Sequence, residues 1–238
     1  MTVKAELLEE LKKHVIFDRK IVASITKDDS YAGLLLHRLK KSGQIMEIER
    51  DRYTVHNDAF LIASRISWPS YISAWSALRY HNLTEQLLQA IWVVTPRKRR
   101  NTLVLFAGTE IRFITALPRH LFGYDKVELR GFEIFVADPE KSIIDSLLFK
   151  KASVSEVSSL IANNLRSLRT AKLLDYAIRT GSVPVIKRTG FLLEKAGIPV
   201  RKRVARYLNA PYLPLEYNLP ATESRSNRDW KILENVVL

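Results

Sequence analysis

Apolar residues in the first 41 positions recur with the 3.6-residue period of an α-helix. Residues 5–14 and residues 17–25 each predict a short helix, and Asp18 is suited to cap the second one. A third helix is predicted from Tyr31 to Lys41, because Asp28-Asp29-Ser30 offers a cap before it and Ser42-Gly43 ends it.

The pattern then changes to the strict alternation that is typical of β-strands. Residues 44–49 and 52–55 alternate apolar and polar positions, and Arg50-Asp51 separates them, which predicts a hairpin. Three helices followed by a hairpin form the arrangement of a winged helix-turn-helix, and we predict this DNA-binding domain for residues 1–57.

The third predicted helix has two different faces. Ala32, Leu35, Leu36 and Leu39 share one side at 100° per residue and are expected to pack inward. The opposite side is small, polar and basic, which suits entry into a major groove about 12 Å wide. The residues predicted to contact DNA come from this side of the helix and from the tip of the hairpin. They are Ser30, Tyr31, Gly33, Leu34, His37, Arg38 and Lys41 in the helix and Arg50 and Arg52 in the hairpin. The alternative is a solvated face, with Leu34 turned into the core.

Residues 58–150 predict a second, mixed domain. Helices are expected over 58–66 and 71–81, and five strand-like runs follow between residues 91 and 136. Asp138-Pro139 then predicts the start of a helix that runs to about Phe149. We therefore expect a small α+β unit with a mostly antiparallel sheet.

The remaining residues, 151–238, predict a helical region with an extended tail. Helical periodicity covers residues 154–168, 170–180 and 183–196. The tail has extended stretches near residues 212–217 and 230–233. The whole chain is thus predicted to be α+β: a winged helix-turn-helix, then a larger α+β region with a small sheet and C-terminal helices.

Composition narrows the class of protein. The chain has 238 residues, 47% of them hydrophobic, which is ample material for a core. With no cysteine, it has no disulfide, thiolate nucleophile or cysteine zinc site. No apolar run approaches the ~20 residues of a membrane span, and the charged start has no apolar signal segment, so we expect a cytoplasmic protein without a membrane partner.

The net charge of +13 favours a polyanionic partner, and nucleic acid is preferred over an anionic membrane surface. Residues 151–210 carry 12 Lys and Arg against 3 Asp and Glu. Three basic clusters are candidates for further phosphate or partner contacts: Arg97, Lys98, Arg99 and Arg100 in a predicted hairpin loop, and Lys187 with Arg188 and Arg201, Lys202 and Arg203 in the helical part. The alternative is that such clusters are merely solvated surface.

Catalytic patterns are weak. The five histidines lack metal-ligand spacing, and no two glycines lie close enough to form a phosphate-binding loop. Glu140 and Lys141 resemble part of a nuclease site, but adjacent residues at a helix start diverge by about 100°. Capping explains this segment better, and Ser142 and Asp145 are expected to contact solvent or another domain. We predict no enzyme, catalytic residue, metal or cofactor.

Four segments in this order resemble the AbiEi family of antitoxins. Residues 72–83 with 91–95 are similar to its middle region, residues 137–145 and 186–194 match two further stretches, and residues 212–215 with 230–235 match its ending. Together with the predicted winged helix, the resemblance covers nearly the whole chain. One departure is Asp51 in the wing, where members of the family often have glycine.

The resemblance implies a transcriptional autorepressor from a type IV toxin–antitoxin pair. The winged helix would bind inverted repeats in double-stranded DNA at its own promoter. The C-terminal part would counter a nucleotidyltransferase-like toxin without a stable complex. Two alternatives stay open: a ligand-sensing winged-helix regulator, which a deep apolar pocket within residues 58–210 would favour, and a nuclease that the winged helix targets to DNA, which convergent carboxylates would favour.

Overall fold

The computed structural model of the chain is an α+β structure and describes residues 3–86, 90–100, 102–222 and 224–238. Its segments form two compact units. The first contains residues 1–71, 89–115 and 126–135, and the second contains residues 72–88, 116–125 and 136–238. The three domains expected from the sequence, 1–57, 58–150 and 151–238, remain a prediction.

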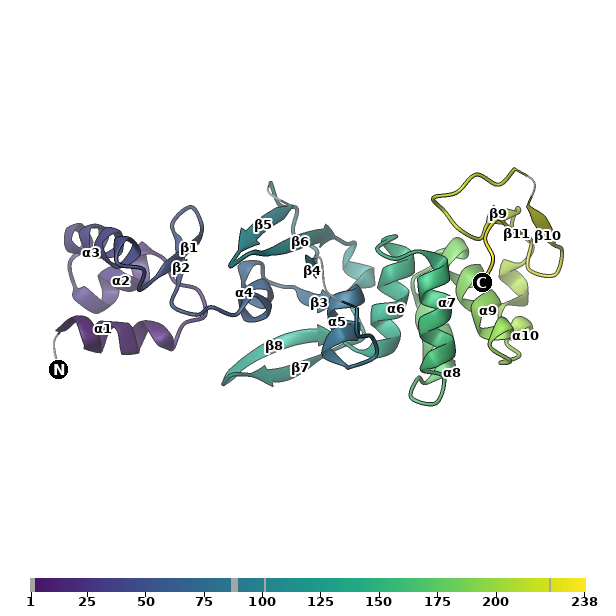
Figure 1. Ribbon diagram of the computed structural model, residues 1–238, viewed down its shortest axis with the longest axis horizontal. Coiled ribbons are helices and arrows are strands. Elements are labelled where there is room, and N and C mark those ends of the chain that lie inside the picture. Colours follow the sequence, from purple (N-terminus) through teal and green to yellow (C-terminus); the bar gives the residue numbers. More distant parts are fainter. Residues whose placement is uncertain (1–2, 87–89, 101, 223) are drawn as a thin grey trace. The chain divides into compact units, whose positions relative to one another are not determined.

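The first unit begins with three helices and a hairpin (Figure 1). The helices are α1 (Val3–Lys12), α2 (Arg19–Thr26) and α3 (Asp29–Lys41), and the antiparallel strands are β1 (Met46–Glu49) and β2 (Arg52–Thr54). Aspartates begin two of the helices, because their carboxylates accept hydrogen bonds from backbone N–H groups that have no partner within the helix. The carboxylates of Asp18 and Asp28 each accept such a bond at 3.0 Å, from the backbone of Ile21 and Tyr31.

These elements enclose a small apolar core. Its buried members are Leu7, Leu11, Phe17, Val22, Ala32, Leu35, Leu36, Leu39 and Ile45. Phe17, which the pattern assigned to a helix, is extended instead and exchanges two backbone hydrogen bonds with Tyr53, of 2.9 and 2.8 Å. The aromatic residue therefore joins the edge of the hairpin rather than the start of α2.

The main sheet is larger than the small one predicted from the sequence. Its six strands are β3 (Tyr71–Ser73), β4 (Ala90–Thr95), β5 (Leu103–Phe106), β6 (Thr109–Thr115), β7 (Tyr124–Leu129) and β8 (Phe132–Ala137), in the order β5-β6-β4-β3-β8-β7. The pairs β4–β6 and β3–β8 are parallel, and β5–β6 is antiparallel. Alternation along a sequence identifies a strand but not its partner. The sequence therefore did not reveal that β4 pairs with β6 rather than with β5, the next strand along the chain.

Helix α4 (Ala59–Ile66) packs against β4 and β6 in the first unit. Residues 71–81, predicted as one helix, form β3 and then α5 (Ala74–Tyr80). The change occurs at Ala74, whose φ of 51° lies in the left-handed region that interrupts a right-handed helix.

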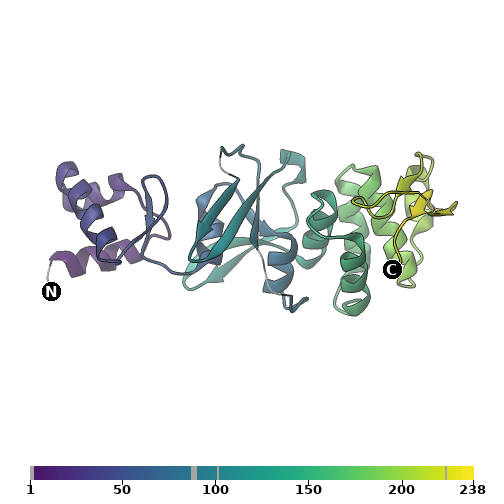
Figure 2. The ribbon, with the colours of Figure 1, turned by 45° about the horizontal axis from the view of Figure 1, so that its top comes forward.

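The second unit is mainly helical (Figure 2). It contains α5, α6 (Pro139–Leu148), α7 (Val154–Asn163), α8 (Thr170–Arg179), α9 (Val183–Lys195) and the short α10 (Arg201–Val204). The tail adds a small sheet of β9 (Leu213–Pro214), β10 (Arg225–Asn227) and β11 (Ile232–Glu234). Leu215, Trp230 and Ile232 of the tail belong to the same buried cluster as the helices, so the tail completes the core.

Candidate nucleic-acid interface

Helix α3 separates its apolar and polar faces as the sequence predicts. Ala32, Leu35, Leu36 and Leu39 are buried, which confirms the inward face. The other face is exposed at Ser30, Tyr31, Leu34, His37, Arg38 and Lys41. Leu34 is 47% exposed, so the alternative in which it joins the core is wrong.

Contacts at both ends hold α3 in place. Asp28 caps its first turn, and Lys40 in its last turn forms an ion pair with Glu47 of β1. The hydrogen bond from Lys40 to Glu47 raises the pKa of the lysine. Basic residues in a last turn also lie at the negative end of the helix dipole, where positive charge is favourable. The exposed face of α3 is thus carried by an element fixed to the hairpin.

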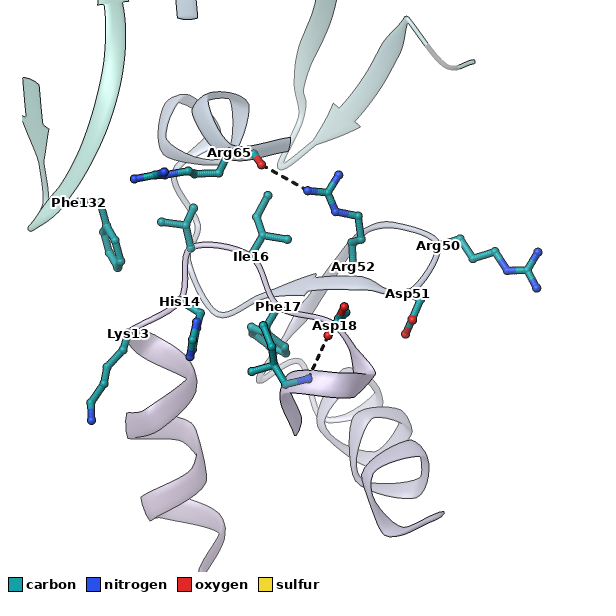
Figure 3. A pocket seen from close by; sticks show the side chains of 12 residues that line it. Lys13, His14, Ile16, Phe17, Asp18, Arg50, Asp51, Arg52, Arg65 and Phe132 are labelled. Carbon is teal, nitrogen blue, oxygen red and sulfur yellow. Dashed lines mark hydrogen bonds between the residues drawn. The ribbon is translucent and has the colours of Figure 1, made fainter. Parts of the chain in front are cut away.

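The two arginines of the hairpin point in different directions (Figure 3). Arg50 is exposed and extends away from the neighbouring side chains. Arg52 turns back toward α4 and donates to the carbonyl oxygens of Ile66, at 2.7 Å, and Arg65, at 3.3 Å. Arg52 also contacts Glu49, at 3.1 Å. We therefore correct the prediction for Arg52, because its guanidinium is occupied within the protein, whereas Arg50 is exposed and forms no ion pair with the described residues.

A hollow of about 580 Å³ lies beside this hairpin. Ile16, Phe17, Arg65 and Phe132 are among the side chains that line it (Figure 3). Asp51 also lines it, and its φ of 57° places the turn between β1 and β2 in the left-handed region.

Another residue, Arg19 at the start of α2, lies beside α3 although the sequence reasoning did not select it. Its guanidinium pairs with the Asp29 carboxylate, with 2.6 Å between Nη2 and Oδ2. A Cβ atom built on Gly33 would lie 3.5 Å from the Arg19 Cζ, so the guanidinium occupies the space above this glycine. The sequence does show that Arg19 is a basic residue directly after the helix cap Asp18. Its position beside Gly33, however, depends on how α2 packs against α3.

The first basic cluster, residues 97–100, does not lie in a hairpin loop, because it connects β4 to β5 and these strands are separated by β6. Arg97, Lys98 and Arg100 are exposed. Arg99 instead forms an ion pair with Glu49 and covers the Phe113 ring, with 4.1 Å from its Cζ to the ring centre. Burial lowers the pKa of Arg99 despite this partner. Arg99 is therefore corrected to a residue that fastens the hairpin to the sheet.

The second cluster is buried in α9, which overturns its prediction as an exposed contact. Lys187 donates to the carbonyl oxygens of Pro211, at 3.0 Å, and Lys231, at 2.8 Å. Arg188 donates to those of Leu215 and Pro214, both at 2.8 Å. Burial lowers the pKa of Arg188, and it lowers that of Lys187 to about 8.

The third cluster, in α10, is exposed. Arg201 pairs with Asp229 at 2.5 Å and Arg203 with Asp175 at 2.6 Å, so part of their charge is balanced within the protein. Exposed pairs exchange partners at little cost, which keeps both side chains available to an acidic partner. Lys202 lies between them and is also exposed.

The start of α6 is a buried polar network. The carboxylate of Asp138 accepts a hydrogen bond from the Lys141 backbone at 2.8 Å, which confirms the predicted cap. Ser142 and Asp145 are fully buried, so the prediction that they contact solvent is wrong. Asp145 pairs with Lys141, and burial lowers the pKa of that lysine. Burial opposes ionisation of Glu140, but bonds from Arg169 outweigh it and lower its pKa.

A further hollow of about 630 Å³ lies within residues 75–164 of the second unit. Its lining is mostly hydroxyl and amide groups: Trp75, Asn82, Leu83, Thr84, Glu85, Gln86, Ser155, Glu156, Ser159, Leu160, Asn163 and Asn164. This lining differs from the deep apolar pocket that a ligand-sensing regulator was expected to have. Within the described residues, no group of three or more His, Asp or Glu is placed to hold a metal ion. Nor does any helix in the same part of the chain have the length and apolar character needed to cross a membrane.

Comparison with known proteins shows a likeness to a solved structure. No model of a protein family matches this sequence, and no curated protein matches it. The structure is similar to the crystal structure of the Rv2827c protein from Mycobacterium tuberculosis, with a TM-score of 0.64 over 97% of this chain and 89% of that chain. The two sequences are 12% identical, so the likeness concerns the fold.

Proposed function

We propose that this chain is a DNA-binding transcriptional autorepressor and the antitoxin of a type IV toxin–antitoxin pair. Residues 1–57 form its winged helix-turn-helix, α3 reads bases in the major groove, and Arg50 contacts the phosphate backbone. The observation that carries this proposal is the exposed polar face of α3, which includes Leu34 and His37 on a helix whose other face is buried.

The dimensions and charge of this part of the chain suit DNA. Thirteen residues make α3 about 20 Å long, enough to follow a major groove over several base pairs. Leu34 offers an apolar contact for a thymine methyl, and His37 and Arg38 offer hydrogen-bond donors for base edges or phosphates. The net charge of +13 adds the sequence-independent attraction that DNA binding requires.

The antitoxin role rests on the resemblance to the AbiEi family, which extends along nearly the whole chain. In this proposal the protein is not an enzyme and needs no cofactor. It counters a nucleotidyltransferase-like toxin without forming a stable complex. The exposed basic residues of α10, Arg201, Lys202 and Arg203, are the surface that we assign to this second activity.

Binding of the full-length protein to its own promoter tests the repressor role. The probes are a duplex from directly upstream of its coding sequence and a random duplex of the same length. Replacing His37 or Leu34 by Ala should lower the preference for the promoter duplex by about 1–3 kcal/mol, because base contacts are lost. Equal binding of the wild-type protein to both duplexes, together with an unrepressed promoter–reporter fusion, contradicts the proposal.

Growth during co-expression with the neighbouring toxin gene tests the antitoxin role. Arg201→Glu with Arg203→Glu should abolish protection while promoter repression persists. Arg50→Ala should weaken promoter repression while protection persists. Point variants are preferred to a truncation after residue 57, because Arg52 and Glu49 bind residues 66 and 99 within the first unit. Growth arrest in the presence of folded wild-type protein would contradict the antitoxin role.

A further inference from the structure

The side chain of Arg19 lies on the exposed side of α3, although it belongs to α2. Its Nη2 group donates to both the Asp29 backbone oxygen, at 3.0 Å, and the Asp29 carboxylate, at 2.6 Å. The same guanidinium lies over Gly33, where the Cζ, Nε and Nη1 atoms are 3.5–3.8 Å from the position that a Cβ would take. The hydrogen bonds to Asp29 therefore hold one cationic group beside the predicted reading face.

The guanidinium keeps hydrogen-bonding capacity in this position. Arginine carries five N–H donors, and the two on Nη2 are directed at Asp29. Within the described part of the chain, the donors on Nε and Nη1 have no protein acceptor. The side chain is 45% exposed, so these groups can reach an acceptor outside the protein.

We propose that Arg19 is a DNA phosphate contact, held ready by its ion pair with Asp29. This inference rests on the proposed DNA-binding function and extends the contact surface from α3 to α2. A phosphate is the expected acceptor because a guanidinium binds phosphate oxygens strongly and DNA offers them along both edges of the groove. Gly33 lies beneath this guanidinium, and a Cβ there would be in ordinary van der Waals contact with it.

A purely structural role would predict a different behaviour. An exposed ion pair contributes little to stability, and the Asp29 side chain is 72% exposed. Loss of the pair should therefore leave the fold almost unchanged. A phosphate contact instead appears in the dependence of affinity on salt, because each neutralised phosphate contributes about −0.9 to the slope of log affinity against log salt concentration.

The experiment measures fluorescence anisotropy of the promoter duplex and of the random duplex at several salt concentrations. Arg19→Ala in the full-length protein should weaken binding to both duplexes by roughly tenfold and make the slope shallower by about 0.9. Arg19→Lys should keep the salt slope and restore part of the affinity, because lysine retains the positive charge but lacks the planar guanidinium with its several N–H donors. Thermal unfolding of each variant establishes that it is folded.

Lys12→Ala is the matched control. Lys12 forms an ion pair with Glu9 of the same length, 2.6 Å, and similar exposure, but on α1. This variant should remove one positive charge without changing the salt slope. If Arg19→Ala and Lys12→Ala give the same slope as a wild-type protein that binds DNA, the inference about Arg19 is wrong and the proposed function stands. If the wild-type protein binds neither duplex, both are wrong.

Discussion

Helices α3 and α9 carry basic residues that look alike in the sequence but differ in the structure. In α3, Arg38 and Lys41 are exposed. In α9, Lys187 and Arg188 are 0% and 6% exposed and donate to carbonyl oxygens of the tail. The first pair can serve a partner, whereas the second pair is part of the core.

This difference shows that a cluster of positive charge becomes a binding surface only where the rest of the chain leaves it uncovered. Buried cations need acceptors, and the tail supplies four backbone oxygens. The net charge of residues 151–210 therefore overstates what this region can offer to a polyanion. The exposed side chains of α10 are the part of that charge that remains available.

The largest expected effect is the loss of Arg188. Replacing it by Met leaves the carbonyl oxygens of Pro214 and Leu215 without their donors, which should lower the free energy of unfolding by about 3–5 kcal/mol. Arg38→Met should change it by less than about 0.5 kcal/mol, because that side chain is exposed. Urea unfolding compares the two variants, and similar losses would remove the distinction between the helices.

The pKa of Lys187 should appear in the pH dependence of stability. It is lowered to about 8 from 10.5, so unfolding takes up a proton between these pH values. Raising the pH through this range should therefore increase the free energy of unfolding, on the order of 2 kcal/mol. The difference between the wild-type protein and Lys187→Met, measured by urea unfolding at pH 7–10, isolates this group. A difference that stays constant with pH would contradict the shift.

Two glycines offer a matched test of how tightly each helix is packed. A Cβ on Gly190 of α9 would lie 2.5 Å from the Trp230 ring, so Gly190→Ala should lower stability by about 1–3 kcal/mol. The corresponding site on α3, Gly33, has its nearest neighbour at 3.5 Å. Gly33→Ala should raise stability by about 0.5–1 kcal/mol through its better helix propensity. Thermal unfolding measures the stability of both variants. A change in stability of the same sign in both would contradict the difference in packing between α9 and α3.

The smallest effect distinguishes the two hairpin arginines. Arg52→Met should lower the free energy of unfolding by about 1–2 kcal/mol, because Ile66 and Glu49 lose a charged donor. Arg50→Met should leave stability unchanged and make the salt slope of DNA binding shallower by about 0.9. Urea unfolding and anisotropy titrations on the same samples separate the roles; an unchanged slope for Arg50→Met would remove it from the interface.

Features that depend on neighbouring residues could be predicted from the sequence. Asp18, Asp28 and Asp138 begin helices because each cap needs only the next three residues, and the buried face of α3 follows from its period. This local information covers most helices and the candidate reading face.

Features that depend on distant partners could not be predicted. The acceptors of Lys187 lie 24 and 44 residues away, and β4 pairs with β6 because of packing rather than proximity in the chain. The backbone of Ala74 is left-handed at the change from β3 to α5. The sequence did not indicate this conformation, because alanine stands at a position where glycine or asparagine would be usual. Arg19 became a candidate only when α2 and α3 were seen together.

The role of the tail also sets the order in which the second unit can be completed during synthesis. The backbone N–H of Val154, at the start of α7, donates to the carboxylate of Glu216 at 2.7 Å, and Trp230 fills the space above Gly190. A ribosome that has made α6–α9 has therefore produced helices whose buried cations and first turn still lack partners. We expect the nascent unit to stay loosely packed and open to proteases until residues 211–232 emerge, so that chains cut short before this point are removed rather than accumulated.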